Sequence, residues 1–365
     1  MAKVATVLCP RIASTPRSKQ GSLQVIASYE RGMTAAPHAL RDSPPWRAIA
    51  AGPAVAVVTL VTALIVTGVA DVPLRDPNGV SVARFLSAFA LVAVLVGLDI
   101  AFRGGRKRWT PARVVAVVSA LVSFYVTYLA YRNLKSVVPL LRPDELFDRR
   151  LGDLDRSLFG GADPAEVLHS VLGSGLSAHA LSLVYEAFFL FIPLALAFAL
   201  VVLPNLRAGL FLTTALAINW VLAAGSYFLL PSLGPIYAES AQFAQLPSTG
   251  VSGLQQALLE QRLEFLRDPS VAGTAQSIGA FASLHVSIFF TAALATHLLG
   301  LGRSVKIAVW VLFALTVAAT VYFGWHYVLD DLAGMAIAVT ALALARAIVG
   351  IDLRAARQQP VESAA

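Results

Sequence analysis

Residues 324–334 read Gly-Trp-His-Tyr-Val-Leu-Asp-Asp-Leu-Ala-Gly and lie between two apolar runs, each about long enough to cross a bilayer. His326 and Asp330 are four residues apart, so on a helix that begins near Trp325 they would share one face, about one turn apart. Asp331 would be rotated by about 100°, either supporting the pair from behind or facing solvent. Ionisable groups at membrane depth cost roughly 2.5–3.5 kcal/mol on insertion scales, and they therefore mark candidate functional sites. The alternative is an interfacial histidine, with Asp330 ending the lipid exposure of its span.

The composition is that of a polytopic membrane protein. Of the 365 residues, 57% are hydrophobic and 13% are charged, and the mean hydropathy is +0.72. A soluble protein of this size needs about twice that charged fraction to cover its surface. The single cysteine, Cys9, excludes a disulfide framework and a thiolate metal site. The net charge of +7 is distributed like that of cytoplasmic membrane-protein loops, so we expect no nucleic-acid partner.

Eight apolar spans of roughly 20 residues predict an all-α integral membrane protein. The spans run approximately over residues 47–70, 82–102, 111–131, 178–203, 208–230, 280–300, 305–323 and 328–349. The first two, within 46–110, look like an addition to a six-helix core over 111–350. Residues 1–45 mix Arg, Lys, Ser and Pro without a long apolar run and are expected to form a disordered cytoplasmic tail, with a second tail over 351–365.

The distribution of basic residues predicts the orientation in the membrane. With eight spans, the face that carries both termini receives 18 of the 28 Lys and Arg residues. The positive-inside rule then places both termini in the cytoplasm, and we expect the plasma membrane as the location. The same count places Lys135, Arg142, His285, His326 and Asp330 together on the extracytoplasmic face.

Two loops on that face, 132–177 and 231–278, are long for a compact membrane protein. The second contains the pattern of an amphipathic helix, with apolar and charged positions interspersed. These positions are Leu254, Leu258, Glu260, Arg262, Leu263, Glu264 and Phe265. We expect interfacial helices or a lid over a site at the membrane surface.

A second histidine, His285, opens the sixth span within Gly279-Ala-Phe-Ala-Ser-Leu-His-Val-Ser287. Free N–H groups and the helix dipole make a helix N-terminus a ready anion site, and Ser283 is expected to cap this helix. A histidine in this position can donate a proton to an oxygen that leaves a phosphate. A buried core histidine is the alternative.

Two cations follow the third span in Lys135-Ser-Val-Val-Pro-Leu-Leu-Arg-Pro143. Seven residues, about two helical turns, separate Lys135 from Arg142. Both can converge on one phosphate, the arginine by a two-pronged contact. The alternative is that both extend their long side chains to the membrane interface.

Together, these motifs resemble those of the type 2 phosphatidic acid phosphatase superfamily, and most closely its inositol phosphorylceramide synthase-like branch. The superfamily pattern is Lys-x6-Arg-Pro, then Pro-Ser-Gly-His, then Ser-Arg-x5-His-x3-Asp. Over roughly residues 111–349, this chain has Lys135-x6-Arg142-Pro143, Ala282-Ser283-Leu284-His285 and His326-x3-Asp330. The Ser-Leu-His and His-Tyr-x-x-Asp-x-x-Ala-Gly forms point to the synthase-like branch, as do Phe159-Gly-Gly161 and Pro231-Ser-Leu-Gly-Pro235.

The chain departs from the superfamily pattern at three points. Ala282 replaces the usual proline, and Thr320 stands where the arginine of the third motif would fall. Arg142 of the first motif lies 143 residues before His285, which is farther than in typical phosphatases. The segment 231–235 lies nearer the expected position.

The resemblance implies a six-helix, phosphatase-like core and a metal-independent phosphatase or phosphotransferase that needs no cofactor. His326 would attack phosphorus and form a phosphohistidine, while Asp330 would orient it and stabilise its positive charge. His285 would protonate the leaving oxygen and then act as base for water or an alcohol. Since a free histidine titrates near pH 6.5, the two histidines can hold opposite protonation states near neutrality. The phosphate would be bound by Lys135, Arg142 and Ser283.

The substrate implied is a phospholipid or prenyl phosphate held among membrane lipids; the sequence does not indicate the acceptor or the oligomeric state. A transporter would favour inverted repeats and a helix broken at midplane, neither of which is found. A metal-dependent membrane hydrolase would use two histidines and an aspartate as zinc ligands, but the local His-x-x-x-His spacing is missing. A glycosyltransferase acting on lipid-linked sugars would show acidic residues in the first outer loop, which has only Asp71 and Asp76.

Overall fold

The computed structural model describes residues 45–76, 79–102, 108–269 and 275–354. All of them belong to the unit Ser43–Ala365, and the unit Met1–Asp42 lies outside the described residues. The predicted tails, 1–45 and 351–365, are therefore almost wholly outside as well. The described residues form helices and no strand, which confirms the predicted all-α class.

Seven described helices are long and apolar enough to cross a membrane. They are α2 (Pro45–Val69), α3 (Val80–Phe102), α4 (Pro111–Leu141), α7 (Leu176–Ala197, continued by the π-helix η3, Phe198–Val202), α8 (Leu206–Leu229), α12 (Arg303–Tyr322) and α13 (Val328–Val349). The remaining predicted span, the sixth at 280–300, contains α11 (Leu284–Leu298), an apolar helix of only 15 residues. It is shorter than the apolar run because Ser283 caps its start and Gly300, with φ +68°, follows its end.

Helix α4 extends ten residues beyond its predicted end at residue 131, reaching Leu141. It begins in the usual way, with Thr110 as N-cap and Pro111 in the first turn. Residues 132–141 continue the helix despite Pro139, so Lys135 is helical and does not lie in a loop as expected.

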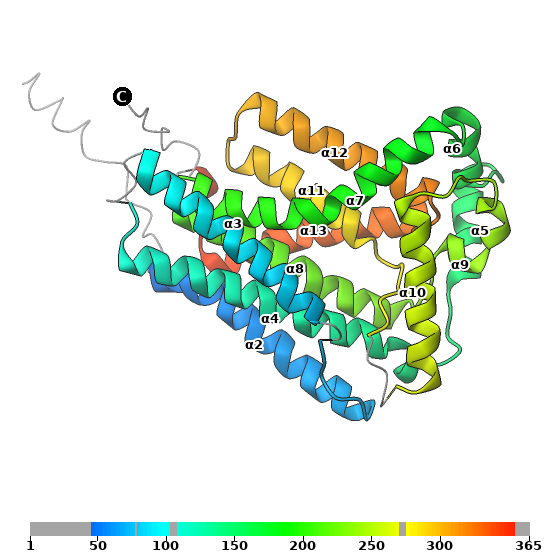
Figure 1. The fold of residues 1–365 in the computed structure, drawn as a ribbon, viewed down its shortest axis with the longest axis horizontal. Coiled ribbons are helices and arrows are strands. Elements are labelled where there is room, and N and C mark those ends of the chain that lie inside the picture. The colour runs from blue at the N-terminus through cyan, green and yellow to red at the C-terminus, as the bar shows by residue number, and fades with distance from the viewer. Residues whose placement is uncertain (1–44, 77–78, 103–107, 270–274, 355–365) are drawn as a thin grey trace, which may run out of the picture. The chain divides into compact units, whose positions relative to one another are not determined.

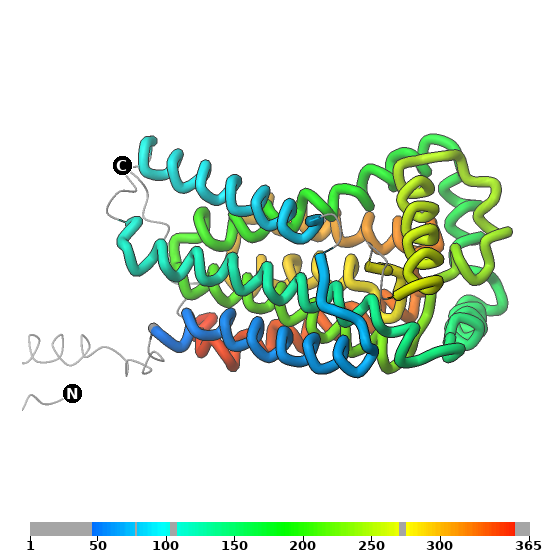
Figure 2. The backbone as a smooth tube through the Cα atoms, turned by 60° about the horizontal axis from the view of Figure 1, so that its bottom comes forward, coloured from blue at the N-terminus to red at the C-terminus, as the bar shows by residue number. Residues whose placement is uncertain are grey.

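The helices pack around α8, most of whose side chains are buried, whereas most side chains of α3 face outward. Helix α8 contacts α2, α4, α11 and α13 (Figure 1). Figure 2 shows α2 running alongside α13, although the two lie at opposite ends of the sequence. Arg47 joins them by donating to the carbonyl oxygens of Ala347 and Ile348 at 2.7 and 3.1 Å, where the end of α13 leaves carbonyl groups unpaired.

Five short helical segments gather at one end of the bundle, at the right of Figure 1. They are α5 (Asp148–Leu158), α6 (Pro164–Leu172), α9 (Pro235–Ala238), the 3-10 helix η4 (Ser240–Phe243) and α10 (Gly250–Arg267). The amphipathic helix predicted in the second long loop is α10, which begins with a reciprocal capping box between Thr249 and Ser252. Leu254 and Leu258 on its inner face pack against a buried aromatic cluster.

Candidate active site

His326 lies in a tight turn between α12 and α13 and is only 6% exposed. Gly324 provides the positive φ of +65° that the turn needs. The backbone N–H groups of Trp325 and His326 both donate to the carbonyl oxygen of Thr320, at 2.9 and 3.3 Å. The end of α12 therefore fixes the position of this histidine.

The aspartate four residues after His326 contacts it as the spacing predicted. Asp330 Oδ2 lies 3.4 Å from His326 Nδ1 and also accepts the Tyr327 N–H at 3.0 Å. Of the two alternatives for Asp331, the solvent-facing one is wrong, because its side chain is 1% exposed and accepts a hydrogen bond from the hydroxyl of Thr320 at 3.0 Å. Thr320 stands where the superfamily pattern has an arginine, so Asp331 contacts a hydroxyl group here and not a guanidinium group.

His285 comes from the start of α11 and reaches the same place. Its ring centroid lies 6.1 Å from that of His326. Two aromatic rings of α7 fix its orientation: Tyr185 stacks on it at 4.5 Å and Phe188 lies at 4.1 Å. Ser283 caps α11 as predicted, its Oγ accepting the N–H of Val286 at 3.5 Å. Two elements distant in the sequence thus bring the two imidazoles together.

Glycine at position 334 allows the two histidine-bearing segments to approach. A Cβ there would overlap the carbonyl oxygen of Ser283. The Ser283 N–H in turn donates to the carbonyl oxygen of Asp330 at 2.9 Å. Helices α11 and α13 therefore meet backbone to backbone at the site, a packing that any side chain at Gly334 would prevent.

A cavity of about 300 Å³ opens beside the histidines and is lined by Lys135, His285 and His326. No described Asp or Glu side chain lines it, so its charged lining is entirely basic. Lys135 has no carboxylate within ion-pair distance among the described residues, and its Nζ lies 4.5 Å from the centroid of the Tyr227 ring. Arg132, also in the lining, pairs with Asp76 at 2.8 Å. The cavity has the charge expected of an anion site.

Neither Arg142 nor Ser283 lines this cavity. Arg142 is the C-cap of α4 with non-helical backbone angles, so it does not continue the face of Lys135. It pairs with Glu145, donates to the carbonyl of Phe228 and lines a neighbouring cavity. The fully buried hydroxyl of Ser283 is occupied in capping α11. That either residue binds phosphate stays a prediction.

Two buried carboxylates of α5 hold the site together, and sequence reasoning missed their role. Asp155 accepts the N–H groups of Val328 and Leu329 at 2.6 and 3.1 Å, and so caps the start of α13 from another helix. Asp148 accepts the N–H groups of Leu233 and Gly234 at 2.8–3.0 Å. The sequence signal was the run of charged residues from Arg149 to Arg156 within the loop 132–177, for which we expected interfacial helices or a lid.

The segment Pro231–Pro235 and the residue after it form hydrogen bonds with the backbone just before each of the two histidines. The carbonyl and hydroxyl oxygens of Ser232 accept the N–H groups of Ala280 and Phe281, at 2.9 and 3.0 Å. Four residues on, the N–H of Ile236 donates to the carbonyl of Gly324 at 2.8 Å. Because Asp148 fixes the same segment, α5 supports both histidines through backbone contacts.

Unpaired polar atoms concentrate at this place. Among the described residues, the buried atoms without a hydrogen-bond partner include Trp325 Nε1, His326 Nδ1, Asp330 Oδ1 and Asp331 Oδ1. Native proteins leave few such atoms unpaired, so a cluster of them needs an explanation such as a catalytic role or a bound ligand. The N–H groups of Leu284 and His285 likewise meet no acceptor in the described part of the chain.

Burial is the largest influence on the pKa values of His326, Asp148 and Asp155, which lie outside the membrane spans. It lowers the pKa of His326 to about 4, with Lys135 adding to the shift and Asp331 opposing it. His326 is therefore neutral at neutral pH, and that the two histidines hold opposite protonation states there stays a prediction. Burial raises the pKa of Asp148 and of Asp155, against the N–H groups that donate to them.

Replacing Asp155 with alanine is expected to lower both stability and turnover. The change leaves two N–H groups of α13 without an acceptor, at a cost of about 1–3 kcal/mol for an unsatisfied buried group. A shift of the His326 turn would reduce kcat by roughly 10- to 100-fold. Thermal unfolding in detergent and steady-state kinetics measure the two effects. Asp153→Ala on the same helix is the control, since Asp153 is exposed and pairs only with Arg156; equal behaviour of the two variants would refute the role of Asp155.

A family model described as the PAP2 superfamily matches residues 149–344. The match spans more than half of the chain, which therefore belongs to the PAP2 superfamily. Membership supports a phosphatase-type enzyme that acts on phosphate esters. The matched region contains His285, His326 and Asp330 but begins after α4, so Lys135 and Arg142 lie outside it. No curated protein and no solved structure matches the chain.

Proposed function

We propose that this protein is a membrane lipid phosphatase or phosphotransferase that acts through a phosphohistidine at His326. The observation that carries the proposal is the 6.1 Å separation of the His285 and His326 rings beside a basic cavity. A phosphoryl group between two imidazoles can be attacked by one and receive a proton at its leaving oxygen from the other. Asp330, next to Nδ1 of His326, leaves Nε2 as the attacking nitrogen.

The reaction has two steps. In the first, a bond forms between His326 Nε2 and phosphorus as the ester P–O bond breaks, and His285 gives its proton to the departing oxygen. In the second, His285 takes a proton from water or an alcohol, whose oxygen attacks phosphorus and releases His326. One group acts as acid and then as base, as microscopic reversibility requires. Asp330 stabilises the positive charge that His326 carries in the intermediate.

Positive groups around the cavity stabilise the charge on the transferring phosphoryl group. Lys135 has no competing carboxylate there, and the free N–H groups of Leu284 and His285 lie at the start of α11. Such preorganised donors are often the largest contribution to catalysis. A bound phosphate brings negative charge that stabilises a protonated histidine beside it. We retain Arg142 and Ser283 as proposed phosphate ligands.

The substrate proposed is a phospholipid or prenyl phosphate, and the acceptor is water or an alcohol. The synthase-like forms of the two histidine motifs favour transfer to an alcohol, as in the inositol phosphorylceramide synthase-like branch. We place the site on the extracytoplasmic face of the plasma membrane because, with eight spans, the sequence assigns 18 of its 28 Lys and Arg residues to the face that carries both termini. Protease added outside intact cells should then cut within 231–278, and protection of that segment would reverse the orientation.

The function is tested by incubating purified protein with labelled phospholipids and prenyl phosphates, with and without alcohol acceptors. Release of inorganic phosphate reports hydrolysis, and a labelled new ester reports transfer. We expect turnover to survive EDTA and to be blocked by vanadate, which mimics the phosphoryl transition state. Loss of activity in the chelator with rescue by zinc would favour the metal-dependent hydrolase, and no turnover of any phosphate ester would refute the proposal.

The pKa of His326 predicts the pH dependence of the first step. Because this pKa is lowered to about 4, the imidazole stays neutral from about pH 8 to about pH 5 and loses its nucleophilicity only as pH falls toward 4. The rate of phosphoenzyme formation should therefore be flat across this range. A p-nitrophenyl phosphodiester is a suitable substrate, since its phosphate does not titrate there. A decrease centred near pH 6.5 would contradict the assignment.

A further inference from the structure

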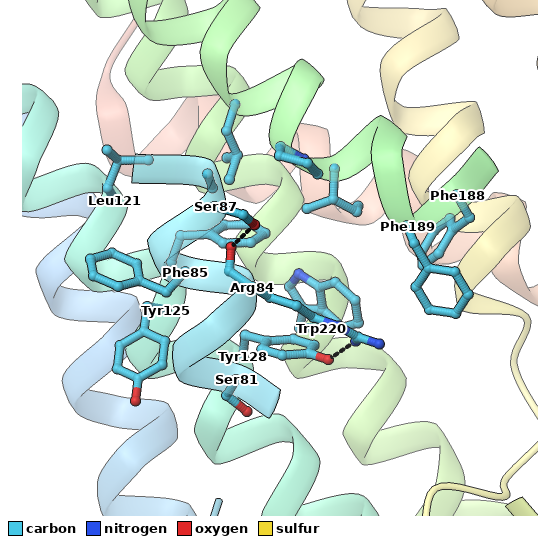
Figure 3. Close-up of a pocket in the computed structure, with 15 residues that line it drawn as sticks. Ser81, Arg84, Phe85, Ser87, Leu121, Tyr125, Tyr128, Phe188, Phe189 and Trp220 are labelled. Carbon is cyan, nitrogen blue, oxygen red and sulfur yellow. Dashed lines mark hydrogen bonds between the residues drawn. The ribbon is translucent and has the colours of Figure 1, made fainter. Parts of the chain in front are cut away.

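A second cavity, of about 80 Å³, lies between α3, α4 and α7 (Figure 3). Its lining is almost entirely apolar and aromatic, including Phe85, Ala88, Leu121, Phe124 and Leu196. Helix α3 forms one wall of this groove. That helix lies outside the region matched by the family model, so the groove is built partly by an addition to the family core.

The groove adjoins the basic cavity of the candidate active site. Arg84, Tyr128, Phe188, Phe189 and Trp220 line both spaces. Phe188 is also the residue whose ring lies 4.1 Å from that of His285. The two cavities therefore share a wall of side chains beside the histidine pair.

Arg84 lies at the junction of the two spaces. Its guanidinium donates to the hydroxyl of Tyr128 and lies 4.9 Å from the centroid of the Phe189 ring (Figure 3). Among the described residues, no carboxylate lies within ion-pair distance of it. A cation within a spanning helix is costly without a partner. An oxygen-bearing group at the junction would supply that partner, with an apolar chain beyond it.

Helix α3 is fixed at both ends, so the groove is a lasting feature of the fold. Near the C-terminal end of α3, the indole Nε1–H of Trp109 donates to the carboxylate of Asp99 at 2.8 Å. At the other end, Arg132 of α4 donates to Asp76 and to the hydroxyl of Ser81 at 2.8 and 2.9 Å. These contacts anchor the added helix against the core at both membrane faces.

We infer that this groove binds a hydrocarbon chain of the substrate, with Arg84 at the junction contacting the polar linkage between chain and phosphate. The inference rests on the proposed function and specifies its substrate class: a phosphate ester whose chain enters the α3–α4–α7 groove while its phosphoryl group lies between the histidines. Burial of each methylene in an apolar site favours binding. The length of the substrate's hydrocarbon chain should therefore control its binding affinity through contacts with α3.

The test compares two tryptophan substitutions on α3. Ala88 is 6% exposed and lines the groove, whereas Ala90, two residues on, is exposed and does not line it. Ala88→Trp fills the groove, so kcat/KM for a long-chain lipid phosphate should fall at least about tenfold, the loss expected when a few methylene contacts are removed. Hydrolysis of p-nitrophenyl phosphate, which has no chain, should stay within about twofold, and Ala90→Trp should leave both substrates unchanged.

The outcomes separate this inference from the proposed function. If the unmodified protein turns over neither substrate, with water or with an alcohol as acceptor, the proposed function fails. If it hydrolyses both and Ala88→Trp retains the chain-length preference, the groove is not the chain site. Should Ala88→Trp lose both activities through misfolding, the test moves to the unmodified protein. A lipid phosphate with a diazirine at its chain end should label peptides of α3, α4 or α7, which line the groove. Labelling confined to other helices would overturn the inference.

Discussion

Replacing His326 with alanine is expected to lower turnover by about 10⁴- to 10⁶-fold, the range seen when a covalent nucleophile is removed. The neighbouring imidazole of His285 cannot take over, because it is held between the rings of Tyr185 and Phe188 and lies on the leaving-group side of the proposed phosphoryl position. The alanine side chain leaves space for water, and direct attack by water is the slow route that remains.

The measurement is a single-turnover experiment with a substrate labelled in its phosphate. The unmodified protein should carry acid-labile, alkali-stable label in the peptide that contains His326, and His326→Ala should carry none. His297→Ala is the matched control, since His297 lies at the opposite end of α11 and its Nε2 accepts the Trp310 N–H at 2.8 Å. Label retained by His326→Ala, or undiminished turnover, would remove the nucleophile assignment.

Local sequence pattern was sufficient for most helices and for one contact of the site. Apolar run length predicts spanning helices because the bilayer leaves no other way to pair the backbone. The four-residue spacing predicted that Asp330 lies beside His326, and the two atoms are 3.4 Å apart. Ser283 was recognisable as an N-cap, which fixed where α11 begins. Each of these follows from residues close together in the chain.

The same local reasoning failed where a helix ends. Lys135 and Arg142 share a face only while α4 continues, and α4 ends at Leu141. The arginine consequently turns to Glu145 and lines a different cavity from Lys135. The approximate span 280–300 also included residues outside α11, because apolar residues before Ser283 extend the hydropathy signal without being helical.

Contacts between distant segments could not be predicted from pattern. Asp148 and Asp155 bind backbone N–H groups more than 80 positions away, and a backbone donor has no sequence signature. The burial of Asp331 against Thr320 depends on how α12 and α13 pack. That His285 meets His326 followed from the resemblance to a family and not from spacing, since separate spans carry them.

His285→Gln is expected to impair catalysis selectively, according to the leaving group. Glutamine preserves much of the size and polarity of the side chain but cannot donate a proton as a general acid. For a lipid phosphate, whose alkoxide leaving group needs a proton, the rate of phosphoenzyme formation should fall by about 10²- to 10⁴-fold, the usual contribution of general acid catalysis. For p-nitrophenyl phosphate, whose leaving group departs without a proton, the same rate should change little.

The comparison must use the first step, because His285 also serves as base in the second step and its loss there would slow both substrates alike. Rapid-quench measurement of label on His326 isolates that step, and His297→Gln at the far end of α11 provides the control for the substitution itself. The selectivity distinguishes proton donation from positioning. A glutamine that merely disturbed the aromatic contacts of Tyr185 and Phe188 would misplace the phosphate for every substrate. An equal loss of rate with both leaving groups would therefore show that His285 orients the substrate and that another group donates the proton.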